Sequence, residues 1–450
     1  MGDQSFFVLK TFMGNSSSLL KSSNLSAKLR REPLQLEQQK LDVVIKSRAN
    51  LFNWRGQFTP EFVEYILHAF AQETYHIFDP FSGSGTVLHE AARLGLKATG
   101  FEINPSAYAM SKFFSFCNLS TKSRNDLCRT FGQKLHFELS TKSHCVANTL
   151  NQAVELFPDC HDKLTFIQQF REQLSCDEET IIFMNMLFLS EKNTHVAISK
   201  LMYNSFDHLK KCLLNLPHSD NPIQTYLLDA RNAGDSLENT VDLILTSPPY
   251  INVFNYHQNY RATVEHFDFD VLRVAHSEFG SNRKNRGNRF KTVIQYCLDM
   301  ELAIRAFWRA LKPQAKMILV VGRESNVRSV PFYNSQLVVE LIEKSNGFSD
   351  VKILERQFTN KFGLCIREDI IIATKTDELS NLFYGRSIAT EHLERSLKIA
   401  PNEVRSDIVA AIENYQSITA SPLFNPNDII KHASHSTPRK ANCSNRKSES

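Results

Sequence analysis

A glycine-rich turn is the first feature of this chain that could do chemistry. Residues 79–86 read Asp-Pro-Phe-Ser-Gly-Ser-Gly-Thr, after an apolar segment and before a helical pattern. Glycines at such a turn let the backbone approach a ligand closely, and the start of a helix presents free N–H groups. The spacing matches neither the dinucleotide fingerprint Gly-x-Gly-x-x-Gly nor a Gly-Lys-Ser/Thr phosphate loop, so a nucleoside triphosphate is not favoured.

Glu102 follows a second apolar segment, within Gly-Phe-Glu-Ile-Asn-Pro at residues 100–105. A carboxylate at the end of a buried strand can accept hydrogen bonds from both hydroxyls of a ribose. The alternative is that Glu102 caps the helix that starts after it. Together with the glycine turn, its position favours ribose binding.

A rigid turn closes a third apolar segment, where residues 245–250 read Leu-Thr-Ser-Pro-Pro-Tyr. Two prolines after a buried strand leave carbonyls without ladder partners and fix the direction of the chain. Tyr250 is thereby held at the carboxyl edge of the sheet, where ligands of open α/β sheets bind. A packed tyrosine in an ordinary turn is the alternative when this motif is considered alone.

A basic stretch lies downstream of that turn, at residues 283–291. It has five positive charges and no acidic residue, which is typical of a loop that contacts nucleic-acid phosphates, although a solvated charge run is the alternative. The residues that could contact these phosphates are Arg283, Lys284, Arg286, Arg289 and Lys291.

Short apolar runs alternate with helical patterns through most of the chain, which predicts an α/β domain with a mostly parallel, seven-stranded sheet. The predicted strands are 75–79, 97–101, 225–228, 241–246, 316–321, 351–355 and 369–374. The predicted helices include 60–71, 87–94, 298–311 and 336–344. Between about residues 120 and 222 the pattern is helical without strong strands, with Met202, Phe206, Leu209 and Leu213 on one face, and a helical insertion between the second and third strands is expected.

These patterns divide the chain into consecutive parts. The predicted parts are an N-terminal arm (1–45), a first α/β segment with the glycine turn and Glu102 (46–119), the helical insertion (120–222), a second α/β segment with the Ser-Pro-Pro-Tyr turn (223–376), a C-terminal helical extension (377–431) and a disordered tail (432–450). The tail is rich in Ser, Asn, Lys and Arg and has little to bury.

Composition excludes several other classes of protein. The nine cysteines form no Cys-x-x-Cys pair, so neither a metal site nor a disulfide framework is indicated. No apolar run is long enough to span a bilayer, and the first ten residues lack the pattern of a cleaved secretory signal, so we expect a cytoplasmic protein, associated with the nucleoid if the basic stretch binds nucleic acid. The net charge of +4 by itself says little about nucleic acid.

The motifs resemble those of the amino-group DNA methyltransferases, which modify cytosine at N4 or adenine at N6. Asp-Pro-Phe-x-Gly-Ser-Gly-Thr followed by Ser-Pro-Pro-Tyr carries the resemblance. Residues 52–60 resemble the upstream motif that closes over the methionine part of the cofactor, and residues 228–232 resemble the acidic position after the third strand. Residues 311–313 fit the later helix–strand step, and the likeness covers about 46–110 and 225–375.

The resemblance implies a Rossmann-like methyltransferase fold with S-adenosylmethionine as the methyl donor. Phe81, Gly83 and Gly85 would line the methionine portion, Glu102 would hold the ribose, and Asp229 would hold the adenine amino group. The cofactor-binding set is Phe58, Asp79, Phe81, Gly83, Gly85, Thr86, Glu102 and Asp229; the catalytic set is Ser247, Pro248, Pro249 and Tyr250.

An exocyclic base amine is a poor nucleophile because its lone pair is delocalised into the ring. Hydrogen bonds accepted by the Ser247 side chain and the Pro248 carbonyl would pyramidalise the nitrogen and turn its lone pair towards the methyl group. Methylation of cytosine at carbon 5 needs a cysteine nucleophile, usually after a proline, and the chain has no Pro-Cys dipeptide. The base must be flipped out of the duplex, and stacking on Tyr250 would offset part of the cost.

Ser before Pro-Pro-Tyr is more typical of family members that act on cytosine N4, so this target is favoured in double-stranded DNA. The sequence leaves open adenine N6, an amino group in tRNA or rRNA, and a non-catalytic DNA-binding protein on a methyltransferase scaffold. A cognate restriction endonuclease is an expected partner; the recognition sequence and the oligomeric state are not specified by these residues.

Overall fold

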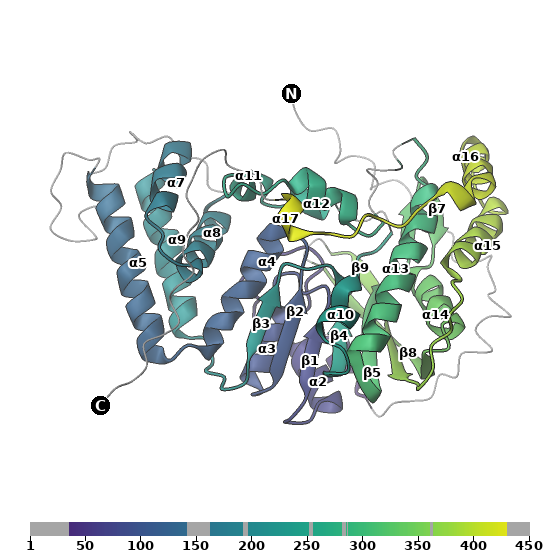
Figure 1. The fold of residues 1–450 in the computed structure, drawn as a ribbon, viewed down its shortest axis with the longest axis horizontal. Coiled ribbons are helices and arrows are strands. Elements are labelled where there is room, and N and C mark those ends of the chain that lie inside the picture. The colour runs from purple at the N-terminus through teal and green to yellow at the C-terminus, as the bar shows by residue number, and fades with distance from the viewer. Residues whose placement is uncertain are drawn as a thin grey trace.

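A seven-stranded sheet forms the centre of the computed structural model (Figure 1), which describes residues 36–141, 163–191, 197–251, 255–280, 285, 287–360 and 363–429. The strand order is β3-β2-β1-β4-β5-β9-β8. The bounds are β1 His76–Asp79, β2 Lys97–Phe101, β3 Ile223–Tyr226, β4 Val241–Thr246, β5 Leu311–Gly322, β8 Phe348–Thr359 and β9 Cys365–Lys375. The predicted α/β, Rossmann-like class with a mostly parallel sheet is confirmed.

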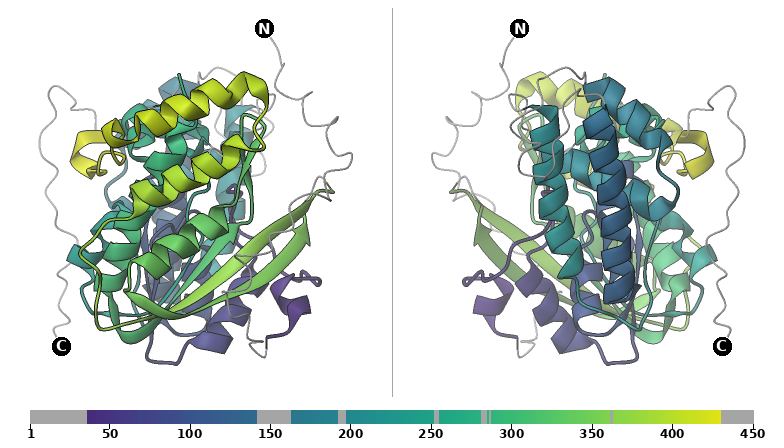
Figure 2. Two further views of the ribbon diagram at one scale, coloured as in Figure 1. Left: turned by 90° about the vertical axis from the view of Figure 1, so that its right-hand side faces the viewer. Right: turned by 90° about the vertical axis from the view of Figure 1, so that its left-hand side faces the viewer.

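The first five strands of the sheet are parallel, whereas β9 runs antiparallel between β5 and β8. All seven predicted strands are present, but four of them differ in extent by two or more residues. β3 begins at Ile223, two residues before its predicted start, and β5, β8 and β9 are much longer than predicted. Figure 2 shows β8 and β9 as a long hairpin that extends beyond the rest of the sheet.

The strand order reverses between β1 and β4, which are paired in parallel with Phe78 opposite Ile244. The segments that leave the two strands therefore diverge and open a crevice at the carboxyl edge of the sheet. Such a switch point is where open α/β sheets bind ligands.

Helices cover both faces of the sheet. Successive side chains of a strand point to opposite faces, so apolar residues of one strand pack into two separate buried clusters. In β5, Ile318 and Val320 pack into one buried cluster with helices α2, α3 and α4, whereas Met317 and Leu319 pack into a second cluster with α13 and α14. The bounds are α2 Pro60–Phe70, α3 Thr86–Arg93, α4 Pro105–Lys112, α13 Lys291–Ala310 and α14 Asn334–Lys344.

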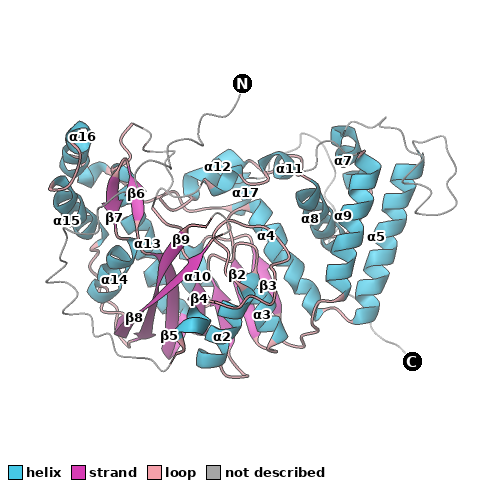
Figure 3. Cartoon of the chain, turned by 180° about the vertical axis from the view of Figure 1, so that it is seen from behind, coloured by secondary structure: helices cyan, strands magenta, loops and turns pink. Residues whose placement is uncertain are grey.

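Helices stand at the β3 end of the sheet, and other helices cover the opposite end (Figure 3). Between β2 and β3 the chain forms α4, the 3-10 helix η1 (Phe113–Asn118), α5 (Thr121–Thr141), α7 (Lys163–Glu172), α8 (Asp177–Ser190) and α9 (Ile198–Leu214). Met202, Leu209 and Leu213 of the predicted α9 face are buried and Phe206 is half-buried.

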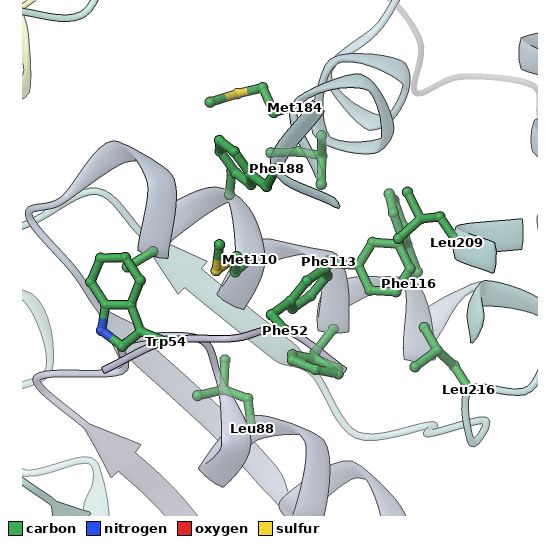
Figure 4. Close-up of a cluster of buried hydrophobic side chains, with 14 of the residues drawn as sticks. Phe52, Trp54, Leu88, Met110, Phe113, Phe116, Met184, Phe188, Leu209 and Leu216 are labelled. Carbon is green, nitrogen blue, oxygen red and sulfur yellow. The ribbon is translucent and has the colours of Figure 1, made fainter. Parts of the chain in front are cut away.

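Large apolar side chains join these helices to the sheet domain. In Figure 4, Met184 and Phe188 of α8 and Leu209 of α9 lie around Met110 and Phe113, which belong to α4 and η1. The interface is continuous with the main core, so the insertion packs as part of the same body.

The chain after the sheet returns to its carboxyl edge. Helices α15 (Gly385–Leu397) and α16 (Asn402–Glu413) pack beside α13 and α14, and residues 418–429, here called the C-terminal strap, cross back towards the sheet and end in α17 (Pro426–Ile429) (Figure 1). The predicted tail at 432–450 lies outside the described residues, as does most of the predicted arm; α1 lies in its described part.

The remaining elements are short. They are α1 Gln38–Leu41, η2 Ala230–Asn232, α10 Ala233–Ser236, η3 Tyr256–Gln258, α11 Arg261–Glu265, α12 Val271–Ser277, β6 Ser325–Val327, β7 Val330–Phe332 and η4 Tyr415–Ser417. Of the described helices, none combines the length and the apolar character needed to cross a membrane.

Candidate active site

A cavity of about 970 Å³, including its mouth, lies at the carboxyl edge between β1 and β4. This is the size range of small-molecule and cofactor sites. Its lining joins the upstream segment, the glycine turn, the end of β2 and the Ser-Pro-Pro-Tyr turn: Trp54–Phe58, Asp79–Ser84, Thr86, Val87, Glu102–Asn104, Asp229, Ala230, Ser247, Pro249, Tyr250, Tyr256, Glu278 and Phe279.

The ends of β1 and β4 are tied together directly. The Thr246 hydroxyl donates a 2.5 Å hydrogen bond to Asp79 Oδ1, which also accepts from the Phe81 N–H. Gly83 and Ser247, which follow these two strands, line the same cavity. The structure therefore brings together the glycine turn and the Ser-Pro-Pro-Tyr turn.

The glycine turn needs its glycines for conformation and for space. Gly83 has a φ of +50° and Gly85 a φ of +87°, both in the left-handed region. A Cβ on Gly83 would lie 3.1 Å from the Trp54 ring, and a Cβ on Gly85 would lie 2.8 Å from the Ser111 Cα. The turn is consequently packed against both the upstream segment and α4.

Glu102 is fixed by two backbone donors. Its Oε2 accepts from the Gly83 N–H at 2.9 Å and its Oε1 accepts from the Asn104 N–H at 2.8 Å. Asn104, not Glu102, caps α4, since its side chain accepts from the first N–H groups of that helix. The carboxylate therefore keeps lone pairs for a ligand while its orientation is set by the turn itself.

Burial raises the pKa of Glu102 to about 7, and burial also raises the pKa of Asp79 to about 7. In Glu102 the two backbone hydrogen bonds oppose this effect, and the neighbouring Asp79 adds to it. The cavity thus contains two carboxyl groups that change charge near neutral pH.

We predict that a ribose-containing cofactor binds more tightly as the pH rises through about 7. Ribose hydroxyls donate to the ionised Glu102, so binding favours deprotonation and affinity is lost as the pH falls below the raised pKa. Calorimetry from about pH 5.5 to pH 8.5 measures this slope. Glu102→Gln should lower the affinity and flatten the profile; an unchanged slope in this variant would assign the proton to Asp79 instead.

Tyr250 is held by hydrogen bonds through its hydroxyl. The hydroxyl lies 3.1 Å from Ser247 Oγ and donates to Glu368 Oε1 at 3.3 Å, and Glu368 pairs with Arg356 at 3.4 Å. Arg356 is 3% exposed and lies between the rings of Phe62 and Phe358. Burial raises the pKa of both Tyr250 and Glu368.

The ring of Tyr250 lies against Gly322 at the end of β5. A Cβ on Gly322 would lie 2.7 Å from Tyr250 Cε2, so no other residue fits without moving the ring. We predict that Gly322→Ala lowers kcat by roughly tenfold to a hundredfold, because a displacement of about 1 Å is enough to spoil a reacting geometry.

Steady-state kinetics and cofactor titration test this prediction, with Gly132→Ala as the control. A Cβ on Gly132 would also meet one aromatic ring, Phe206 at 3.1 Å, but on α5, away from the cavity. Equal losses in the two variants would contradict a specific effect on Tyr250.

The other predicted residues occupy varied positions. Phe58 and Thr86 line the cavity, and the Thr86 hydroxyl donates a hydrogen bond to Asn50 Oδ1. Pro248 is buried within the Ser-Pro-Pro-Tyr turn. Gly85 shapes the turn without lining the cavity.

Asp229 borders the cavity, but its carboxylate is bound within the protein. Its two oxygens accept from the Arg231 side chain and from the Phe424 N–H of the C-terminal strap. Arg231 also donates to Asp299 and to the Ser421 carbonyl. The contacts of Asp229 hold this wall in place, and its direct contact with the adenine amino group of the cofactor stays a prediction.

The basic stretch is only partly described. Arg283, Lys284 and Arg286 lie outside the described residues, whereas Arg289 is exposed and Lys291 is half-buried at the start of α13. Asn288 ties this stretch to α16 by donating to the Asp407 carbonyl at 2.6 Å. Across the described ranges, no group of three or more His, Cys, Asp or Glu side chains could hold a metal ion.

Several residues that line the cavity were not predicted as site residues, and four of them bring an aromatic ring or a carboxylate to it. Trp54 stacks on Tyr256 at a centroid distance of 6.0 Å and an angle of 19°, and Phe279 meets Phe81 at 5.3 Å. Glu278 is the fourth. Trp54 lies within the upstream motif at 52–60, but residues 256, 278 and 279 belong to no recognisable pattern.

Residues 30–113 match the N6/N4 DNA methylase family model. A curated relative, the type II methyltransferase M.MjaII of Methanocaldococcus jannaschii, is 21% identical over 398 residues, which cover 64% of this chain and 74% of that protein. One similar solved structure is TrmN from Thermus thermophilus, which is 12% identical with a TM-score of 0.30; the match covers 71% of this chain and 50% of that chain. Another is a SAM-dependent methyltransferase from Methanosarcina mazei, which is 12% identical with a TM-score of 0.31; the match covers 70% of this chain and 98% of that chain.

The matched segment contains the upstream motif, the glycine turn and Glu102, which all line the one cavity. The family match over residues 30–113 and the curated relative, together with the motifs that meet in this cavity, support a likeness to the amino-group (N4/N6) DNA methylases, for which S-adenosylmethionine is the methyl donor.

Proposed function

We propose that this protein transfers a methyl group from S-adenosylmethionine to the N4 amine of cytosine in double-stranded DNA. The observation that carries the proposal is that Ser247 of the Ser-Pro-Pro-Tyr turn and Gly83 of the glycine turn line one cavity. An everted base beside Ser247 would therefore meet the reactive end of a cofactor held by the glycine turn.

The cavity residues fit the cofactor. Gly83 and Ser84 offer close backbone approach, and Glu102 offers a carboxylate of fixed orientation for the ribose hydroxyls. Trp54 and Tyr256 supply apolar surface over the turn. When bound, S-adenosylmethionine supplies an electrophilic methyl group on a sulfonium.

The hydroxyl network sets the role of Ser247. Tyr250 has one hydroxyl proton, and it is donated to Glu368. The Ser247 hydroxyl is therefore the donor in its 3.1 Å contact with Tyr250, which leaves its lone pairs to accept from the base amine. With the Pro248 carbonyl as the second acceptor, the amine would be held with its lone pair towards the methyl group.

The same network offers a route for the proton that the amine loses when its nitrogen is methylated. Ser247, Tyr250 and Glu368 form a chain that ends on a carboxylate. Burial raises the pKa of Glu368, and the ion pair with Arg356 opposes this rise. A carboxylate whose pKa is raised towards the working pH suits the role of a proton acceptor in general acid–base catalysis.

DNA binding would use the basic stretch and the Tyr250 ring. Arg289 and Lys291, with the neighbouring Arg283, Lys284 and Arg286, would contact phosphates and position the duplex. Flipping a base costs a few kcal/mol, of which stacking returns about 1–3 kcal/mol. Phosphate contacts would supply the remainder.

The test is to incubate the protein with labelled S-adenosylmethionine and duplex DNA, with tRNA in parallel, and to identify the modified nucleoside by mass spectrometry. We expect N4-methylcytosine in DNA. N6-methyladenine would change the target base within the same family, and label in tRNA alone would overturn the choice of DNA. No cofactor binding at all would favour a non-catalytic DNA-binding protein.

The curated relative is named a type II methyltransferase, which supports a role beside a restriction endonuclease. DNA methylated by this protein would then resist cleavage at one short recognition sequence. Digestion of the methylated DNA with a panel of endonucleases tests this role.

A further inference from the structure

Glu278 lies on the wall of the cavity, immediately after α12, and no sequence motif contains it. It is 7% exposed and is one of the residues that line the cavity. The next residue, Phe279, meets Phe81 of the glycine turn at 5.3 Å. Glu278 is thereby held facing the cofactor end of the cavity.

Only one of the two carboxylate oxygens of Glu278 has a partner. Oε2 lies 2.9 Å from Nδ1 of His257, which is itself buried. Oε1 is buried and has no hydrogen-bond partner in the structure. A buried acceptor without a donor is uncommon in folded proteins because its desolvation is not compensated, so a ligand that brings a donor would complete it.

The neighbours of Glu278 belong to the cofactor side of the cavity. Tyr256 lines the cavity together with Glu278 and stacks on Trp54. Trp54 in turn packs against Gly83 of the glycine turn. Burial raises the pKa of Tyr256, and the carboxylates of Glu102 and Glu278 add to this effect. Glu278 and Glu102 therefore line the same cavity and both lie near Tyr256.

We propose that Glu278 is a cofactor-binding residue whose Oε1 accepts a hydrogen bond from an N–H or O–H donor of S-adenosylmethionine. The cofactor offers donors of three kinds, its ammonium group, its ribose hydroxyls and its adenine amino group, and it has an excess of positive charge that a second carboxylate complements. His257 acts as a positioning residue, since it holds Oε2 and leaves Oε1 directed to the ligand. The inference rests on the proposed function only for the identity of the cofactor.

The experiment is calorimetric titration of Glu278→Gln, Glu278→Asp and wild-type protein with S-adenosylmethionine, S-adenosylhomocysteine and adenosine, without DNA. Glu278→Gln has the same shape without the charge, and Glu278→Asp keeps the charge but retracts it. Because a hydrogen bond to a charged group is involved, we expect Kd for S-adenosylmethionine to rise at least about tenfold in both variants. A loss that extends to adenosine assigns the donor to the nucleoside part, its ribose hydroxyls or its adenine amino group, and a loss confined to the two amino-acid-bearing ligands identifies the ammonium.

Glu340→Gln is the matched control. Glu340 also pairs with a buried histidine, His392 at 3.1 Å, but on α14, outside the cavity. This variant should bind all three ligands as the wild type does, while its thermal unfolding reports the cost of losing such a pair.

Unchanged Kd values in folded Glu278→Gln and Glu278→Asp would overturn the proposal, as would a loss that appears only in the KM for DNA, which would assign Oε1 to the base. If the wild type itself bound no S-adenosylmethionine, the proposed function would fail. The two failures are therefore distinguishable.

Discussion

Replacing Ser247 by alanine is expected to lower kcat by about a hundredfold to a thousandfold while the Kd for the cofactor stays near the wild-type value. Ser247 Oγ is the side-chain acceptor proposed for the base amine, and removal of one such polar group from an active site typically costs about 3–4 kcal/mol in the transition state. The change also removes the 3.1 Å contact to the Tyr250 hydroxyl, so the orientation of that hydroxyl is weakened at the same time. Single-turnover methylation of duplex DNA with saturating cofactor measures the effect.

Ser84→Ala is the matched control, because it removes the same atom from the opposite wall of the same cavity. Ser84 Oγ donates to Gln57 Oε1 at 2.7 Å, so its loss should loosen the upstream segment over the cofactor. We expect a higher cofactor KM and little change in kcat. A kcat near wild type in Ser247→Ala, or the same loss in both variants, would contradict the role given to Ser247.

Gly85→Ala should cost roughly 2–5 kcal/mol of unfolding free energy. A non-glycine residue at a φ of +87° costs about 1–2 kcal/mol, and overpacking adds about 1–3 kcal/mol. Overpacking applies because the new Cβ would lie 2.7 Å from the Phe114 ring and 2.8 Å from the Ser111 Cα, and the second of these is backbone that cannot rotate away. Because the turn would have to shift, cofactor binding should be lost as well.

Gly95→Ala separates the two causes. Gly95 also has a left-handed φ, +68°, but nothing lies within 4 Å of an added Cβ. Urea denaturation should therefore show only the conformational cost, about 1–2 kcal/mol, and cofactor binding should persist. Equal destabilisation in the two variants would mean that contact with α4 does not constrain the turn.

Local patterns predicted the elements that position the site, because the apolar strands and the turns after them are encoded by adjacent residues. β1, β2 and β4 were placed within one residue of their observed bounds, and the glycine turn and Ser-Pro-Pro-Tyr follow β1 and β4 as expected. Strand ends were harder to predict where the hairpin β8–β9 leaves the core, because half-exposed positions there have weak periodicity.

Long-range contacts could not be predicted in the same way. Arg356 and Glu368 face each other only because β8 and β9 pair in one register, which no local pattern encodes. One partner of Asp229, the Phe424 N–H, comes from the C-terminal strap, and the interest of Glu278 lies in a second carboxylate oxygen that has no donor. In each case the missing information was which segments meet.

The C-terminal strap has a consequence for how the enzyme is made. Ser421 accepts from Arg231 across 190 positions of sequence, and the Phe424 N–H completes the partners of Asp229. A nascent chain that has already formed β1 to β4 still lacks these donors and acceptors until residue 424 has left the ribosome. One wall of the cavity would then be finished only at the end of translation, so a ribosome-bound intermediate stalled before that point should fold its sheet yet bind ligand poorly.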